Sequence, residues 1–232
     1  YPLRYEDTPA FQYYPASERT SEYREGPFMG YRYYDTSMVL FRYPFGYGLS
    51  YTEFAYLALE VDEKGVQLTV TNVGERDGAE VVQLYVGFPD SVVFRPQKEL
   101  KGFQKVFLKA GESKRVHIPF DDKTFRYWNV KTGRWEVEEG EYLIMVGACV
   151  ADIRLSGKLW IAGTTSKMPY EKEKLPSYYS GLINNVGAEE FETLLGHPAP
   201  SGKWQGELEL NDAICQMYYA KSRLARLVYR IL

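Results

Sequence analysis

The chain has 232 residues and a formal net charge of −3 at pH 7. This length suffices for one or two domains with a sizeable core. So small a charge creates no overall field that would favour nucleic acid or an anionic membrane, and we expect neither as a partner. No run of residues is long and apolar enough to predict a membrane-spanning helix.

The cysteine content gives the same general picture. Cys149 and Cys215 lie far apart and match neither a disulfide framework nor a metal-ligand spacing. We interpret them as free, buried thiols in a reducing compartment. Together with the lack of a secretory segment in this sequence, they favour the cytoplasm, although the sequence resembles a piece of a longer protein whose own leader would decide its address.

Residues 1–42 show no clean hydrophobic period. We expect an extended run over residues 28–34, with Gly30 inside it. A segment this long without a period rarely forms a core of its own. Residues 1–25 are therefore expected to be loosely held or to pack on the flank of the following domain.

Residues 43–54, with the sequence YPFGYGLSYTEF, form the junction to the rest of the chain. Pro44 fixes its own φ angle, and Gly46 and Gly48 permit backbone angles that other residues resist. Large aromatic side chains surround these residues and can clamp the turn by packing. We interpret the stretch as a rigid hinge.

Short alternating apolar runs separated by turn residues fill the region from residue 54 to residue 162. Val66, Leu68 and Val70, for example, share one face of an extended run. The pattern predicts a mainly β, immunoglobulin-like antiparallel β-sandwich, with a barrel as the structural alternative. The expected strands span residues 54–61, 66–71, 81–86, 100–108, 113–120, 135–137, 142–150 and 153–161.

The C-terminal part changes character twice. Residues 163–186 are polar and punctuated by proline, which predicts a linker. Residues 188–195 have helical periodicity and are followed by Gly196 and Pro198, which predicts a short amphipathic helix that ends there.

A second, longer helix is expected after Asn211 or Asp212, either of which can cap it, with a break near Ser222. Basic side chains accompany its apolar positions, which is compatible with docking on a neighbouring domain or a second chain, or with lying on a membrane. We favour docking, because tyrosines occupy much of the apolar face. The basic residues are Lys221, Arg223, Arg226 and Arg230.

The junction contains the motifs GYRYYD (30–35) and PFGYGLSYT (44–52), and the strand region contains RPQKELKGF (95–103), AGE (110–112), FRYW (125–128) and GEYLIMVG (140–147). The first two resemble the junction between the α/β sandwich domain and the C-terminal fibronectin type III-like domain of family 3 glycoside hydrolases, a family of β-glucosidase-like enzymes. The other four are similar to the fibronectin type III-like domain of that family in both order and spacing. The resemblance covers about residues 23–162.

The resemblance implies a division into four parts: a remnant of the α/β sandwich domain and the junction, a fibronectin type III-like β-sandwich, a linker, and a helical tail of a kind carried by some bacterial members. They span residues 1–42, 43–162, 163–186 and 187–232.

The resemblance also implies the function. The parent would be a retaining β-glucosidase-like glycoside hydrolase acting in carbohydrate degradation, and this chain its non-catalytic scaffold. In the family the nucleophilic aspartate comes from a (β/α)8 barrel and the acid/base glutamate from an earlier part of the sandwich domain, and this chain holds neither motif. We expect no catalytic, cofactor-binding or metal-binding residue and no cofactor.

The expected partners follow from this assignment. They are the missing upstream catalytic domains of the same polypeptide, with a homodimer left open. Carbohydrate substrate is expected to meet this chain only through the parent enzyme. The two alternatives are a free-standing carbohydrate-binding module, which would need exposed coplanar aromatic rings, and a protein-binding β-sandwich.

Titratable residues give little sign of chemistry. The adjacent acids Glu6-Asp7, Asp121-Asp122, Glu138-Glu139 and Glu189-Glu190 point apart on a strand or helix, and we interpret them as solvated surface charge.

Three further titratable residues are expected to be structural or solvated. His117 and His197 lack the additional ligands that a metal site requires, and Glu25 is expected to form a salt bridge at the junction.

The loop at residues 87–97 is the main candidate for contact with the missing domains, because loops placed by a rigid scaffold often carry function. We expect Phe88, Phe94 and Arg95 at its exposed tip. Three junction residues are added as candidate interdomain contacts: Tyr31, Arg32 and Tyr47.

Another aromatic group invites a functional interpretation. We interpret its members as core and strand-pairing residues rather than as a platform for sugar rings. They are Tyr85, Tyr127, Trp128 and Trp135.

Overall fold

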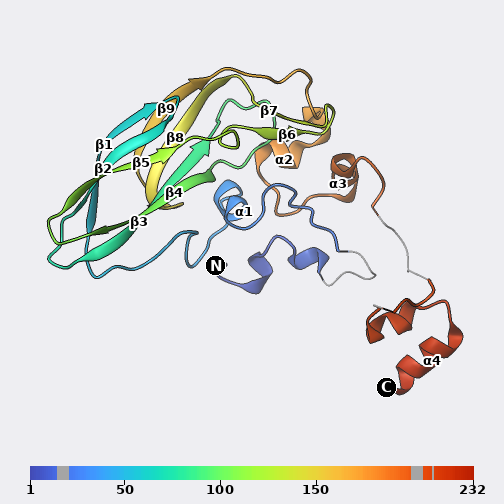
Figure 1. Ribbon diagram of the computed structural model, residues 1–232. Coiled ribbons are helices and arrows are strands. Elements are labelled where there is room, and N and C mark those ends of the chain that lie inside the picture. Colours follow the sequence, from blue (N-terminus) through green and yellow to red (C-terminus); the bar gives the residue numbers. More distant parts are fainter. Residues whose placement is uncertain (15–20, 200–205, 211) are drawn as a thin grey trace.

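The computed structural model describes residues 1–14, 21–199, 206–210 and 212–232 (Figure 1). Its centre is an antiparallel β-sandwich, as the sequence pattern predicts. One sheet has the strand order β1-β2-β5, the other has the order β4-β3-β8-β9, and β6 and β7 form a separate hairpin. The strands are β1 (Phe54–Asp62), β2 (Gly65–Asn72), β3 (Gly78–Gly87), β4 (Glu99–Leu108), β5 (Ser113–Pro119), β6 (Tyr127–Asn129), β7 (Arg134–Glu136), β8 (Gly140–Cys149) and β9 (Asp152–Ile161).

Alternation along the strands builds the core between the two sheets. Val66, Leu68 and Val70 of β2 are buried, and they face Leu84 of β3 and Ile144 of β8 in one hydrophobic cluster. Because side chains alternate between the faces of a strand, each of these strands turns one face inward. Each expected strand is present, and the sequence pattern missed only β6, which has three residues.

A second hydrophobic cluster forms beside the sandwich. Three short helices contribute to it: α1 (Tyr31–Thr36), α2 (Pro176–Ser180) and α3 (Ala188–Leu195). The extended run expected over residues 28–34 is therefore wrong. Gly30 has a φ of 59°, a left-handed angle that turns the chain into α1 and buries Tyr33 against the cluster.

The segment expected to be a linker packs into this second cluster. Leu175, Tyr178, Ile183 and Val186 are all buried. The sequence pattern did not predict their burial, because each apolar side chain is separated from the next by exposed residues. Residues 163–186 therefore lie against the body of the protein, while the four domain boundaries themselves stay a prediction.

Hydrogen bonds tie the N-terminal region to the same cluster. The Tyr13 hydroxyl and Arg24 Nη1 both donate to the Val186 carbonyl, at 3.1 Å and 2.8 Å. The Tyr178 hydroxyl donates to the Arg24 carbonyl at 2.7 Å. Segments more than 150 positions apart in the sequence are thus joined through buried and half-buried polar contacts.

Phe94 occupies the middle of the second cluster. Its ring centroid lies 5.1 Å from that of Tyr170, 5.3 Å from that of Tyr178 and 6.3 Å from that of Phe28. Its side chain is 9% exposed. The expectation of an exposed loop tip is therefore wrong for Phe94, which joins the loop between β3 and β4 to segments from both ends of the chain.

Glu25 is buried beneath this cluster, and its Oε2 has no hydrogen-bond partner in the described structure. The salt bridge expected for Glu25 is absent from the described ion pairs, because the neighbouring Arg24 turns to Glu22 instead, at 2.7 Å. Burial raises the pKa of the Glu25 carboxyl, since desolvation disfavours the charged form.

The C-terminal tail contains the 3-10 helix η4 (Ile214–Tyr219) and the helix α4 (Arg223–Ile231). The break expected near Ser222 is confirmed, because Ser222 is the N-cap of α4 and its hydroxyl accepts from Ala225 N. Of the two expected caps, Asn211 lies outside the described residues. Asp212 does not cap η4, since its carboxylate accepts from Glu209 N instead.

The tail also corrects the expectation for the thiols. Cys149 is buried, whereas Cys215 on η4 is exposed. Among the described helices, none combines the length and the apolar character that crossing a bilayer requires.

Replacing Phe94 by alanine tests the role of the second cluster. We expect Phe94→Ala to lower the free energy of unfolding by about 3–5 kcal/mol, because it leaves a cavity among buried rings. Phe103→Ala is the matched control, since Phe103 on β4 is 66% exposed. Urea denaturation of the 232-residue chain measures both, and equal effects would contradict the assigned role.

Replacing Glu25 by glutamine tests the buried carboxyl. Its folded-state pKa is raised, so its ionisation destabilises the fold only as the pH rises above the unfolded-state value. We expect Glu25→Gln to stabilise the chain by on the order of 1 kcal/mol at pH 7 and by little at pH 4.

Thermal unfolding at both pH values measures this difference. Glu63→Gln serves as the control, because Glu63 is exposed in the turn between β1 and β2. A gain that is independent of pH would contradict the explanation by ionisation.

Candidate interdomain contact face

The hinge is fixed to the sandwich at its C-terminal end by Asn72. This side chain is fully buried and accepts from Thr52 Oγ1 at 2.5 Å and from Gly74 N at 3.1 Å. Its Nδ2 donates to the carbonyls of Arg76 at 2.7 Å and Leu108 at 3.2 Å. A buried amide with all these partners holds one geometry, which anchors the hinge at Thr52, while the rigidity of residues 43–54 as a whole stays a prediction.

The other end of the hinge lies against β3 and the end of β8. The Phe45 carbonyl accepts from Val150 N at 3.1 Å, and the Gly46 carbonyl accepts from Gln83 Nε2 at 3.3 Å. Gly46 has a φ of 81°, and a Cβ there would lie 2.2 Å from Gln83 Oε1. Only glycine fits this close approach.

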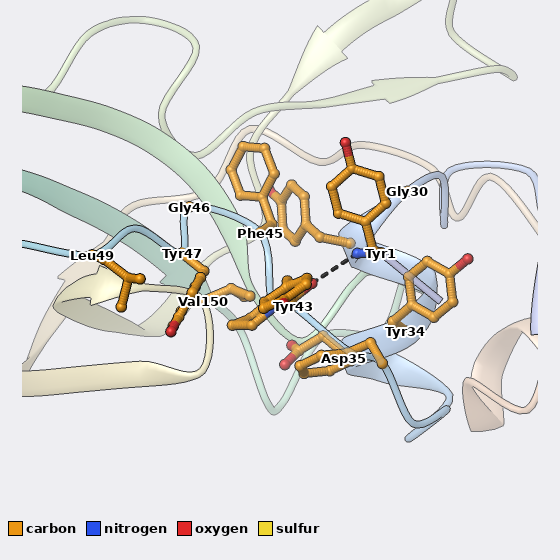
Figure 2. A pocket seen from close by; sticks show the side chains of 13 residues that line it. Tyr1, Gly30, Tyr34, Asp35, Tyr43, Phe45, Gly46, Tyr47, Leu49 and Val150 are labelled. Atoms are coloured by element: carbon orange, nitrogen blue, oxygen red, sulfur yellow. Dashed lines mark hydrogen bonds between the residues drawn. The ribbon is translucent and has the colours of Figure 1, made fainter. Parts of the chain in front are cut away.

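Between α1 and the hinge lies a hollow of about 620 Å³, which we name the aromatic hollow (Figure 2). Its lining is mostly apolar and rich in rings. The lining residues are Tyr1, Gly30, Tyr31, Tyr34, Asp35, Phe41, Tyr43, Pro44, Phe45, Gly46, Tyr47, Leu49 and Val150.

Ring contacts hold the hollow open and leave its faces exposed. Tyr31 stacks on Phe45 with centroids 4.5 Å apart, and Tyr43 lies beside Tyr47 at 5.5 Å. Tyr31 is held in addition at its hydroxyl, which accepts from Leu100 N at 2.7 Å. Tyr43, Phe45 and Tyr47 remain about half exposed, and Leu49 is 88% exposed. Exposed apolar area gathered in this way is typical of surfaces that contact a protein, a membrane or a ligand.

One carboxylate lines the hollow. Asp35 Oδ1 pairs with Lys98 Nζ at 2.9 Å, while Asp35 Oδ2 is buried without a hydrogen-bond partner in the described structure. Arg32 lies in the first turn of α1, and its Nη2 is 3.4 Å from Glu99 Oε1. The wall formed by α1 therefore combines tyrosine rings with the Asp35 carboxylate, whereas the hinge wall is mostly aromatic.

The structure places the six candidate contact residues in different environments. Tyr31 and Tyr47 line the hollow, and Arg32 lies next to it on α1. Their role as interdomain contacts stays a proposal. Phe88 is buried and stacks on Tyr142 with centroids 4.3 Å apart, so, like Phe94, it is no exposed tip residue.

Glu138 is the reason that the loop at residues 87–97 folds inward. Its carboxylate accepts from Val92 N at 2.9 Å, Val93 N at 3.2 Å and the Ser91 hydroxyl at 2.7 Å. Arg95 Nε lies 2.7 Å from Glu138 Oε2, and the Arg95 side chain is nine-tenths buried. The prediction of a solvated charge is therefore wrong for Glu138, because sequence adjacency to Glu139 says nothing about the loop that comes to meet it.

In the remaining acid pairs at least one carboxylate is exposed, as predicted, and some of their members also accept hydrogen bonds from nearby turns and helices. Glu190 accepts from Ser177 N at 2.7 Å and so satisfies the first turn of α2. Asp121 accepts from Lys123 N and the Thr124 hydroxyl at the turn after β5. These hydrogen bonds are structural, and no sequence periodicity marks them.

The other candidates for chemistry remain on the surface. His117 on β5 and His197 are exposed, and the described residues hold no cluster of three or more potential metal ligands.

The rings expected to be structural divide into two groups. Tyr85 is buried, whereas Trp128 and Trp135 form an exposed cross-strand pair on the β6–β7 hairpin. Their ring planes meet at 73°, so they form no flat platform for a sugar ring.

This chain is similar in sequence to a known domain family and to known enzymes. A profile of the fibronectin type III-like domain matches residues 80–149. Thermostable beta-glucosidase B of Acetivibrio thermocellus is 43% identical over 172 residues, which cover 71% of this chain and 23% of that protein. An exo-alpha-(1->6)-L-arabinopyranosidase of Bifidobacterium longum is 48% identical over 157 residues, covering 66% and 21%.

Solved structures show the same relationship. The GH3 beta-glucosidase of Bifidobacterium adolescentis superposes with a TM-score of 0.67 and 31% identity, covering 98% of this chain and 28% of that one. The beta-glucosidase of Kluyveromyces marxianus gives 0.65 and 40%, covering 70% and 20%. The chain thus spans between a fifth and a third of the length of these relatives. By these comparisons the chain corresponds to the C-terminal region of family 3 glycoside hydrolases such as these, the region that carries the fibronectin type III-like domain.

Proposed function

We propose that this chain is the bracing region of a β-glucosidase-like glycoside hydrolase, and that the aromatic hollow packs against the catalytic portion of the same polypeptide. The observation that carries the proposal is the group of exposed rings between α1 and the hinge (Figure 2). The relatives extend far beyond the matched region, and we take the partner of the hollow to be the corresponding remaining portion of this polypeptide.

The energetics favour a covered hollow. Half of a buried tyrosine or phenylalanine side chain amounts to about 100 Å², and apolar burial contributes about 25 cal/mol per Å². Covering Tyr43, Phe45 and Tyr47 would therefore stabilise the assembly by about 2.5 kcal/mol per ring before ordering costs. Because Asn72 and Gln83 already fix the hinge, little entropy is lost when a partner docks there.

The hollow itself cannot perform glycoside hydrolysis. A retaining mechanism needs two carboxyl groups about 5 Å apart that flank one sugar, and Asp35 is the one acid among the lining residues. Removal of a terminal β-linked sugar, with retention of anomeric configuration, is accordingly assigned to the other part of the polypeptide. The chain contributes by holding that part in position.

Two substitutions in the hollow test the docking. We expect the double variant Tyr47→Ser/Leu49→Ser to destabilise the complete enzyme by about 2–3 kcal/mol, since it removes apolar area from the proposed contact. The 232-residue chain alone should lose less than about 0.5 kcal/mol, because both residues are on its surface.

Thermal unfolding and kcat/KM on a chromogenic β-glucoside are the measurements. Trp160→Ser is the control, since Trp160 on β9 is an exposed aromatic residue outside the hollow. Equal losses in the enzyme and the isolated chain would overturn the docking, and hydrolysis by the isolated chain would overturn the bracing role.

A further inference from the structure

The C-terminal tail is a small folded unit with almost no core. Its helices η4 and α4 turn back on each other, and Lys221 N donates to the Gly206 carbonyl at 2.9 Å. Among residues 206–210 and 212–232, only Ala220 and Ala225 are buried. A helix of nine residues is marginal in water on its own, so this unit needs a partner surface to be stable.

The apolar residues of α4 gather on one face. Leu224, Leu227 and Ile231 are spaced three and four apart and are 69%, 54% and 77% exposed. Residues with this spacing are neighbours on a helix surface. The face is therefore a continuous apolar stripe that nothing in the described structure covers.

Beside this stripe lies a hollow of about 490 Å³ between α4 and η4. Its apolar lining comes from both helices and from the irregular segment before them. A shaped hollow of this kind accepts a protruding side chain, whereas a lipid surface would require only a flat apolar face. The lining residues are Glu207, Leu208, Met217, Lys221, Ser222, Leu224, Ala225 and Val228.

The polar side of α4 is basic. The helix contains Arg223, Arg226 and Arg230 and no acidic residue, and Lys221 precedes it. A surface that meets α4 should therefore be apolar in the middle and acidic at the rim. Two copies of α4 packed on each other would bring their arginines together, which disfavours a second copy of this chain as the partner.

We propose that the tail is a second docking element, and that the α4 stripe and its hollow seat on an apolar, acid-rimmed surface of the catalytic portion of the same polypeptide. The inference rests on the proposed function. It is supported by the solved Bifidobacterium adolescentis enzyme, whose match extends over 98% of this chain, tail included. Attachment in the same polypeptide also gives the tail a high effective concentration for such a contact.

Hydrogen–deuterium exchange in the complete enzyme and in the 232-residue chain tests the proposal. We expect the amides of residues 223–232 to exchange at least tenfold more slowly in the complete enzyme. Leu227→Asp in the enzyme should restore the fast exchange of the isolated chain. Leu182→Asp is the matched control, because Leu182 is 55% exposed and lies outside the tail.

Each other outcome overturns the proposal. Equally fast exchange in both proteins would show an undocked tail. Protection of the tail in the isolated chain that increases with protein concentration would show that a second copy is the partner. Protection of the enzyme's tail only with phosphatidylserine vesicles would show a lipid surface. Amides of residues 43–51, followed in the same experiment, report on the aromatic hollow separately, so failure of the tail and failure of the bracing role are distinguishable.

Discussion

The carboxylate of Glu138 is the constraint on which the arrangement of this chain depends. By accepting two backbone N–H groups and a hydroxyl, and by pairing with Arg95, it folds the loop between β3 and β4 inward. A buried charge is stable only when its lone pairs are satisfied in this way. The inward fold places Phe94 in the second cluster, where the beginning and the end of the chain meet. Glu138 is thus one link between the sandwich and the second cluster, beside the contacts of α1 with β4 and its preceding loop.

This linkage makes the sandwich, residues 21–39 and the segment after β9 one packed body. The second cluster buries Tyr178 and Val186 from the segment after β9 against Phe28 and Tyr33 from the N-terminal region. The exposed hinge rings are therefore presented by a packed scaffold, which is the condition under which a contact surface contributes most of its burial as binding energy. The tail differs, because its own packing is too small to fix it without a partner.

The candidate site was predictable in part. The hinge followed from its proline, glycines and rings, and Tyr31 and Tyr47 line the hollow beside it. Asp35 was not predicted, because an unpaired buried oxygen is a property of the packed structure alone. Phe88 and Phe94 lie in the predicted loop, but their side chains are buried and not exposed at its tip. Loop sequences carry no period that tells which residues point inward, so the direction was decided by Glu138, more than forty positions away.

The sequence by itself determined the strands of the sandwich, the helix at residues 188–195 and the break at Ser222. Each of these rests on interactions within a few residues: alternation on a strand, spacing on a helix, or a capping hydroxyl. Only the tertiary structure decided that residues 28–34 turn into a helix, that residues 163–186 pack rather than link, and that Glu25 and Glu138 are buried. These features depend on contacts between segments far apart in the chain. The free energy of such contacts exceeds local conformational preference, and no local pattern in the sequence reveals them.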